Sequence, residues 1–258
     1  MRVAPLLCLL SAAPTSGFHA LPAPQKSFAR AQPPNTPHNL FVGRARVRLQ
    51  ADDPFDVPRP DPAILVSAKP EAEQKLWIAG IGAGIAAGVA VLVALISAID
   101  PLLPADVVSF VGNANAVLIG LFFAGLGVAH FAVKDAFTGV VPPLGTWGGL
   151  WQVPAPGAEE LKLSYAEFHV AWTGVAEVGG GLLLAASGLG LVPAALQQVD
   201  AFLLFLLTIA VTPANVYQFT HDAQMVGAGP PLKYPDSHIV RAGVQVVLLG
   251  ELWKLAFH

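Results

Sequence analysis

Five long apolar segments are the feature that most constrains what this chain can fold into. They cover residues 76–99, 107–133, 168–192, 201–219 and 239–257. About 20 residues of α-helix cross the hydrocarbon core of a bilayer, because the core is about 30 Å thick and a helix rises about 1.5 Å per residue. The sequence therefore predicts an all-α membrane protein with five transmembrane helices.

The composition agrees with a membrane protein and excludes several functional classes. Of the 258 residues, 12% are charged, whereas an average soluble domain has about 25%. Six of the fourteen Lys and Arg residues lie within the first 51 positions, and all seventeen acidic residues follow them. The acidic remainder argues against a nucleic-acid partner. Cys8 is the only cysteine, so a chain without its leader has no disulfide framework, cysteine-ligated iron–sulfur cluster or covalent haem.

The first 51 residues have the composition of a targeting leader. Residues 1–17 combine one positive charge, a short apolar core and small residues, as signal peptides do. Residues 18–51 are basic and free of acidic side chains, which is typical of a transit peptide. The series resembles the bipartite plastid-targeting leaders of algae with secondary plastids. We expect a cleaved leader over 1–51 and a plastid membrane location, thylakoid or inner envelope; the alternative is a secretory signal and a secretory-pathway membrane.

The rest of the chain divides into three predicted parts. Residues 52–73 are rich in Pro and Asp and are expected to form a disordered linker. Residues 74–99 are expected to form an additional N-terminal transmembrane helix. Residues 107–258 contain the other four predicted spans, and the connection over 134–167 holds tryptophans that favour the bilayer surface.

Three glycines in the first span, Gly80, Gly84 and Gly88, are four residues apart. This spacing allows the backbone of another helix to approach closely. That helix belongs either to the protein's own bundle or to a partner.

Polar side chains gather at one end of the predicted spans. Counting residues along each helix places five of them in the same half of the membrane, and they come from four helices. They are His130, Glu177, Asn215, Arg241 and Gln245. Ionisable residues inside a membrane usually mark a functional site, which suggests a shared polar pocket. The alternative is a buried ion pair between Glu177 and Arg241, with the two amides as structural hydrogen-bonding groups.

Two backbone features accompany these side chains. Pro213 lacks an N–H donor and is expected to bend the fourth span, leaving a carbonyl group that Asn215 can satisfy. Gly174 and Gly181 lie near the same face as Glu177. Close packing at these glycines is expected to bury the carboxyl group among helices, away from lipid.

Four motifs occur in series, one on each of the last four spans: GVAHFAVKDAFTGVVPP, WTGVAEVGGGLLL, TPANVYQFTHDAQM and HIVRAGVQVVLL. In this order they resemble the DoxX family of small membrane proteins, over about residues 107–257. The resemblance implies a DoxX-like four-helix transmembrane bundle, with the first span as an extra helix. The chain departs from the family where Ala132, Val133 and Lys134 follow the His-Phe pair, a place where family members often have Pro.

The resemblance also implies a link to quinones, because the family is named after subunits of a thiosulfate:quinone oxidoreductase. We interpret the polar cluster as a quinone pocket in a redox-complex subunit, with Glu177 and His130 as catalytic groups that exchange protons. The predicted pocket residues are Asn215, Arg241, Gln245 and His221. A bound quinone is the cofactor considered, no metal is predicted, and catalysis by the chain alone is left open.

Two other interpretations stay open. The protein is alternatively a non-catalytic subunit or assembly factor of a redox or photosynthetic membrane complex, surrounded by membrane lipid. A weaker alternative is b-type haem bound by two of the histidines near one membrane face. These are His130, His169, His221 and His238.

Overall fold

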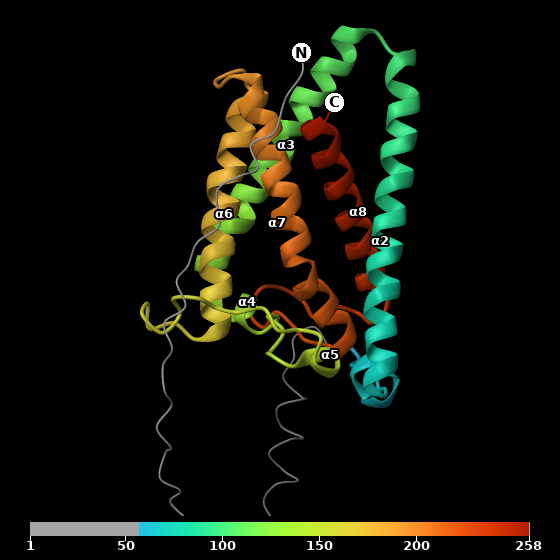
Figure 1. Cartoon of the computed structure of the whole chain (residues 1–258), viewed down its shortest axis with the longest axis vertical. Helices are drawn as coiled ribbons and strands as arrows, with labels where there is room; N and C mark the ends of the chain where they lie inside the picture. Colours follow the sequence, from blue (N-terminus) through green and yellow to red (C-terminus); the bar gives the residue numbers. More distant parts are fainter. Residues whose placement is uncertain (1–56, 258) are drawn as a thin grey trace, which may run out of the picture. The chain divides into compact units, whose positions relative to one another are not determined.

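In the computed structural model residues 57–257 are described, so the predicted leader over 1–51 lies outside them. This part of the chain is helical, and no strand occurs within 57–257. Five long helices are joined by two short turns and by two longer connections, over 133–164 and 222–235 (Figure 1). The long helices are α2 (Glu71–Ile99), α3 (Ala105–Ala132), α6 (Tyr165–Gly188), α7 (Ala194–His221) and α8 (Asp236–Phe257). The short elements are η1 (Pro62–Ile64), η2 (Val66–Ala68), η3 (Asp100–Leu102), α4 (Lys134–Thr138) and α5 (Thr146–Gly149).

Four of the helices are long and apolar enough to cross a membrane: Glu71–Leu102, Ala105–Ala132, Tyr165–Gly188 and Ala194–His221. The fifth predicted span is also a helix, α8, but it is not one of these four. Its apolar residues are interrupted by Arg241, Glu251 and Lys254. The structure therefore confirms four apolar spans, and α8 is a more polar helix packed beside α7 and α2.

Two boundaries differ from the sequence-based expectation. Helix α7 begins at Ala194, directly after Pro193, so it includes seven residues that precede the predicted fourth span. Proline suits the residue that precedes a helix because it has no N–H to leave unsatisfied. In the segment expected to be a disordered linker, residues 57–73 instead contain η1, η2 and the start of α2, and Leu65 and Val66 are buried.

Helices α3 and α6 pack with their backbones in direct contact. A Cβ atom on Gly120 would lie 2.4 Å from the backbone nitrogen of Ala185, and one on Gly181 would lie 2.4 Å from that of Ala124. Gly127 is similarly close to the backbone of Gly174 and Val178. Small residues let membrane helices approach this closely. Glycines seven residues apart on each helix therefore determine the α3–α6 contact.

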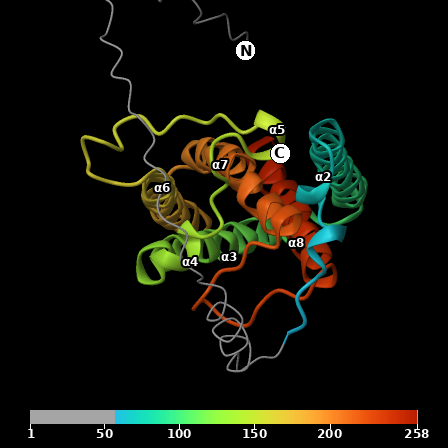
Figure 2. The same cartoon turned by 90° about the horizontal axis from the view of Figure 1, so that it is seen from below.

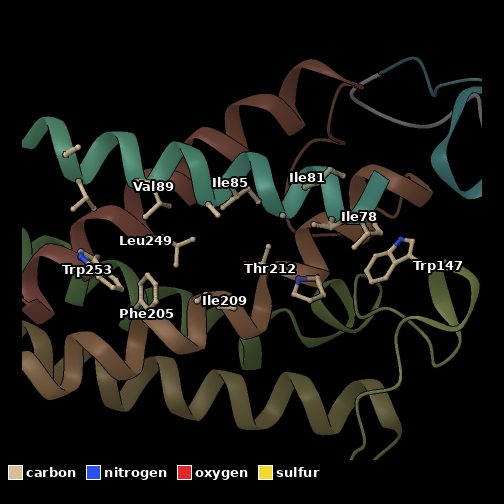
Figure 3. A pocket seen from close by; sticks show the side chains of 17 residues that line it. Ile78, Ile81, Ile85, Val89, Trp147, Phe205, Ile209, Thr212, Leu249 and Trp253 are labelled. Atoms are coloured by element: carbon tan, nitrogen blue, oxygen red, sulfur yellow. The ribbon is translucent and has the colours of Figure 1, made fainter. Parts of the chain in front are cut away.

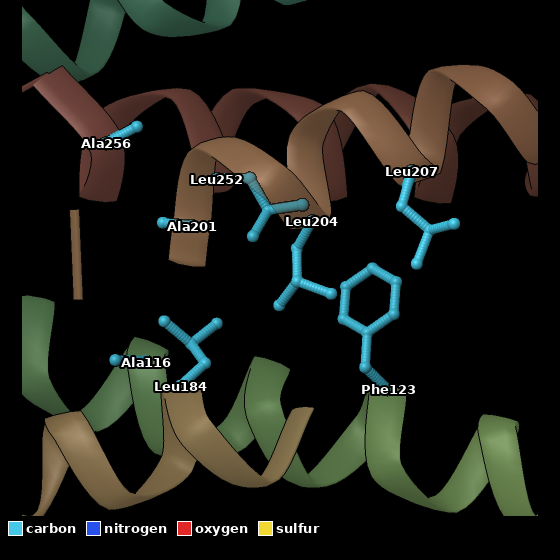
Figure 4. Close-up of a cluster of buried hydrophobic side chains, with 8 residues drawn as sticks. All are labelled: Ala116, Phe123, Leu184, Ala201, Leu204, Leu207, Leu252 and Ala256. Atoms are coloured by element: carbon cyan, nitrogen blue, oxygen red, sulfur yellow. The ribbon is translucent and has the colours of Figure 1, made fainter. Parts of the chain in front are cut away.

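A compact apolar core joins this pair to α7 and α8. Figure 4 shows side chains from all four helices pointing toward one another. The core residues are Ala116, Phe123, Leu184, Ala201, Leu204, Leu207, Leu252 and Ala256. Many leucines and phenylalanines outside this core remain exposed, as expected of helices that face lipid.

Helix α2 lies at the edge of the bundle beside α8 (Figure 2) and has no buried residue. A Cβ atom on Gly88 would lie 3.0 Å from the Val246 side chain, whereas one on Gly80 or Gly84 would meet nothing within 4 Å. The glycine row of the first span thus contacts the protein's own bundle only at Gly88.

Candidate functional site

The ends of four helices meet on the side where the polar residues were predicted to gather. Lys134, just after α3, forms a 2.6 Å ion pair with Glu167 at the start of α6, and this carboxylate raises the pKa of the Lys134 ammonium group. The long connection covers the same end, because the buried Trp147 donates a 2.9 Å hydrogen bond from Nε1 to the Thr220 hydroxyl of α7. The predicted surface loop is therefore a cap over the helix ends.

His130 and Glu177 meet between α3 and α6. Nδ1 of His130 is 3.1 Å from Oε2 of Glu177 and 2.9 Å from the carbonyl oxygen of Leu126. The ring also stacks on Phe137, with the two ring centroids 3.9 Å apart. Glu177 is 1% exposed, which confirms the prediction that its carboxyl group is buried among helices. Gly174 makes this possible, since a Cβ atom there would lie 2.8 Å from Cβ of His130.

Arg241 lies between α7 and α8 and is held by two amide groups. Its Nη1 donates to Oε1 of Gln218, and its Nη2 donates to Oδ1 of Asn215. Across residues 57–257 no carboxylate is within 4.0 Å of the guanidinium group. Arg241 is therefore a half-buried cation whose charge is met by neutral oxygens alone.

Gln245, one turn after Arg241, continues this network. Its Oε1 accepts a 2.9 Å hydrogen bond from Asn215, and its Nε2 donates to the Thr212 hydroxyl at 2.8 Å and to the Thr208 carbonyl at 3.2 Å. The network starts at the Pro213 segment of α7, which continues as a helix beyond the proline to His221. The Thr208 carbonyl thus receives a hydrogen bond from α8. Asn215 bonds to Gln245 and Arg241, so it does not satisfy a carbonyl group beside Pro213 as predicted.

The structure separates the predicted pocket into two clusters. Glu177 pairs with His130, and Arg241 pairs with Asn215 and Gln218, so the predicted alternative of a Glu177–Arg241 ion pair is wrong. His221 belongs to neither cluster. Its Nδ1 is 2.8 Å from the Thr220 hydroxyl oxygen, and its ring centroid is 4.5 Å from that of Tyr217.

The Arg241 cluster borders a cavity of about 170 Å³, which is also lined by Thr212, Asn215, His238 and Gln245. This cavity adjoins an apolar groove of about 730 Å³ between α2, α7 and α8. Figure 3 shows Ile78, Ile81, Ile85 and Val89 of α2 pointing toward Ile209 and Phe205 of α7. Trp147 lies near one end of this groove and Trp253 at the other.

The two spaces share a wall. Ile81, Ile85, Thr212 and Val216 line both the polar cavity and the apolar groove. Together they form an elongated, mainly apolar site, and the polar side chains of Arg241, Asn215, Gln245 and His238 lie at one end of it. Binding sites for small molecules commonly have volumes of about 300–1,000 Å³ and a few polar groups that orient the ligand.

His130 faces a different and smaller space. It lines a cavity of about 80 Å³ with His169, Thr173, Val211 and Ala214. This volume is too small for a porphyrin, and within the described chain no group of three or more His, Cys, Asp or Glu side chains is placed to hold a metal ion. The predicted haem ligands His221 and His238 do not line this cavity.

Sequence reasoning missed several residues of these clusters. Gln218 is three residues after Asn215 on the same helix face, and this spacing is a signal that could have identified it. Thr208 and Thr212 gave no signal, because hydroxyl groups in membrane helices usually bond to their own helix.

The other polar end of the bundle is held by contacts to α3 and η3. Glu251 and Lys254 are three residues apart on α8 but do not pair with each other. Instead, Oε2 of Glu251 accepts a 2.9 Å hydrogen bond from Asn115, and Lys254 pairs with Asp100. These residues line a separate cavity of about 630 Å³.

Comparison of the chain with models of protein families, with curated proteins and with solved structures gave no match. The DoxX resemblance accordingly stays a prediction that rests on the four motifs.

Proposed function

We propose that this integral membrane protein binds a quinone and is a subunit of a redox complex, of the DoxX type suggested by its motifs. One observation carries the proposal: a guanidinium group without a carboxylate partner lies at the polar end of a long apolar groove. A quinone combines a head of carbonyl acceptors with a long apolar tail, and therefore matches both parts of this site.

The hydrogen-bonding groups of the cavity suit a quinone head. Arg241 has five N–H donors, of which two are used by Asn215 and Gln218. Quinone carbonyl oxygens accept hydrogen bonds, and a bond from a charged donor contributes about 1.5–3 kcal/mol. His238 lines the same cavity, and its buried Nε2 has no hydrogen-bond partner among residues 57–257. The head is therefore expected next to Arg241, with the tail along α2.

A redox role needs electrons and protons as well as binding. Reduction of a quinone to a quinol takes two electrons and two protons. We assign the electrons to a partner protein that carries a flavin or an iron–sulfur centre. We assign proton exchange to Glu177 and His130, the buried pair on the other side of the α7 segment that holds Asn215.

The proposed location is a plastid membrane, thylakoid or inner envelope, and the proposed partners are redox or photosynthetic subunits. Both rest on the composition of residues 1–51, and a secretory-pathway membrane is the alternative.

Mass spectrometry of the lipophilic molecules that co-purify with the mature protein tests the proposal. We expect a quinone at close to one molecule per chain, and its loss from the Arg241→Met variant. Lys254→Met is the matched control, because it removes a cation that lies at the other polar end and is paired with Asp100. Bulk lipid alone in all three samples would contradict a quinone site and favour the non-catalytic subunit or assembly factor.

A further inference from the structure

Asp200 is a buried carboxylate that neither polar cluster explains. It lies on α7, is 5% exposed, and its Oδ2 has no hydrogen-bond partner in the described structure. No basic side chain within residues 57–257 comes within 4.0 Å of it. Gly180 of α6 leaves room for it, since a Cβ atom at that glycine would lie 3.4 Å from Oδ1 of Asp200.

The N-terminus of α7 does not stabilise the charge of Asp200. It follows the first residue of α7, Ala194, by six positions, or about 9 Å of helix. The favourable interaction of acidic groups with a helix N-terminus falls off within the first turn, so it does not account for Asp200. Ionisable side chains in membrane helices almost always have a partner, whereas Oδ2 of Asp200 has none among residues 57–257.

Asp200 lines one end of a groove between α6 and α7. The groove has a volume of about 500 Å³, and its other walls are apolar, including Ala176, Leu203, Leu206 and Ala210. Leu203 and Leu206 are 56% and 45% exposed, so the groove opens on the outer surface of the bundle. From Asp200 to Ala210 it extends over about 15 Å of helix, or nearly three turns.

We propose that the α6–α7 groove holds a transmembrane helix of a partner protein, with a Lys or Arg side chain paired with Asp200. Charge complementarity gives the partner its basic residue, because a cation is the group that best compensates a buried carboxylate in lipid. The shape of the groove favours a helix as the occupant, because its apolar walls run along α6 and α7 for nearly three turns.

The basic residues of this chain's own helices favour a different protein over a second copy. Arg241 is engaged by Asn215 and Gln218, and Lys254 by Asp100, so neither is available to reach Asp200 of another copy. Lys75 lies at the start of α2, at the opposite end of the bundle from the start of α7 that holds Asp200 (Figure 1). The inference does not depend on the quinone site, which lies on the α8 side of α7.

Synthetic membrane-spanning peptides test the proposal directly. The probes are Leu/Ala helices of about 20 residues that carry one Lys, Leu or Glu at the depth of Asp200. A fourth probe carries Lys two turns away. The full chain is placed in phosphatidylcholine nanodiscs, and binding is followed by energy transfer to a dye on the peptide. We expect the Lys peptide at matching depth to bind about tenfold more tightly than the Leu peptide.

Charge reversal at position 200 distinguishes an ion pair with the peptide from nonspecific binding. Asp200→Asn is expected to remove the preference for Lys, and Asp200→Lys is expected to transfer it to the Glu peptide. Equal binding of the Lys and Leu peptides by the unaltered chain would overturn the proposal, and this comparison needs no variant to fold. An Asp200-dependent retention of phosphatidylethanolamine, without peptide discrimination, would also overturn it by assigning the groove to lipid.

Discussion

At the level of single residues, Arg241 is the group whose surroundings are most unusual. Depth along each helix was enough to predict that Arg241, Asn215 and Gln245 lie at one end of the bundle. Depth does not give the rotation of each helix about its axis, and rotation decides which side chains meet. For this reason the sequence did not separate the Arg241 network from the His130–Glu177 pair, which lie on different sides of α7.

Glu177→Gln is expected to preserve quinone binding but to change proton uptake, because Glu177 does not line the Arg241 cavity. Infrared difference spectra, recorded while an electrode reduces the bound quinone, measure this directly, since the electrode supplies the electrons. We predict that reduction changes the carboxyl band of the unaltered protein and that this change is absent in the variant. Identical spectra of variant and unaltered protein would remove Glu177 from the proton path.

Gln218→Leu tests the second amide that holds Arg241. Loss of one hydrogen bond to a charged group weakens the positioning of the guanidinium, and such bonds contribute about 1.5–3 kcal/mol. We expect roughly tenfold weaker quinone binding in a titration of the purified protein. Gln224→Leu is the control, because Gln224 bonds to Asp222 and the Leu232 backbone outside the cavity. Equal affinities in the two variants would show that Gln218 does not position Arg241.

At the level of helices, the apolar pattern predicted all five long elements but not their different characters. The charges of α8 were visible in the sequence, yet only the structure shows that Arg241 and Lys254 are both engaged by other helices or turns. The glycine rows also show that sequence spacing does not predict which helix faces are in contact. Gly80 and Gly84 have the spacing of a packing motif, but a Cβ atom on either would meet nothing within 4 Å. The tightest contact is formed by Gly120 and Gly181, each of which has a second contact glycine seven residues away on its helix.

Gly181→Leu is expected to destabilise the protein strongly, because its side chain would enter the α3 backbone. Overpacking costs about 1–3 kcal/mol even where side chains can move aside, and here the obstructing atoms are backbone. Gly84→Leu is the matched control and is expected to be neutral or slightly stabilising, since leucine favours helix by several tenths of a kcal/mol over glycine. Equilibrium unfolding in mixed micelles compares the two. Similar losses in both variants would contradict the assigned α3–α6 contact.

At the level of the whole molecule, the proposed quinone site combines parts that are far apart in the sequence. Its apolar wall comes from α2, its polar end from α7 and α8, and one end is closed by Trp147 from the connection between α4 and α6. No local pattern predicts such a site, because each part is an ordinary helix face or loop by itself. The sequence indicated the polar end, because polar side chains are unfavourable in lipid. It did not indicate the groove that we propose for the quinone tail.

Ile85→Trp tests whether the two spaces act as one site, because Ile85 lines both. The larger ring is expected to fill the groove near the cavity and to exclude a long tail. We predict that a quinone with a long isoprenoid tail loses at least about tenfold in affinity, while a tail-free quinone is affected less. Ile99→Trp, at the exposed far end of α2, is the control. Equal losses for both quinones would indicate that the tail does not use this groove.

The most direct test of the proposed quinone site is photolabelling with a quinone that carries an azido group on its ring, followed by mass spectrometry of the peptides. We predict labels between residues 208 and 219 of α7 and between 238 and 245 of α8, competed by unlabelled quinone and absent in Arg241→Met. Competed labels only near His130 on α3 and α6, or labels that unlabelled quinone does not displace, would contradict a headgroup site at Arg241.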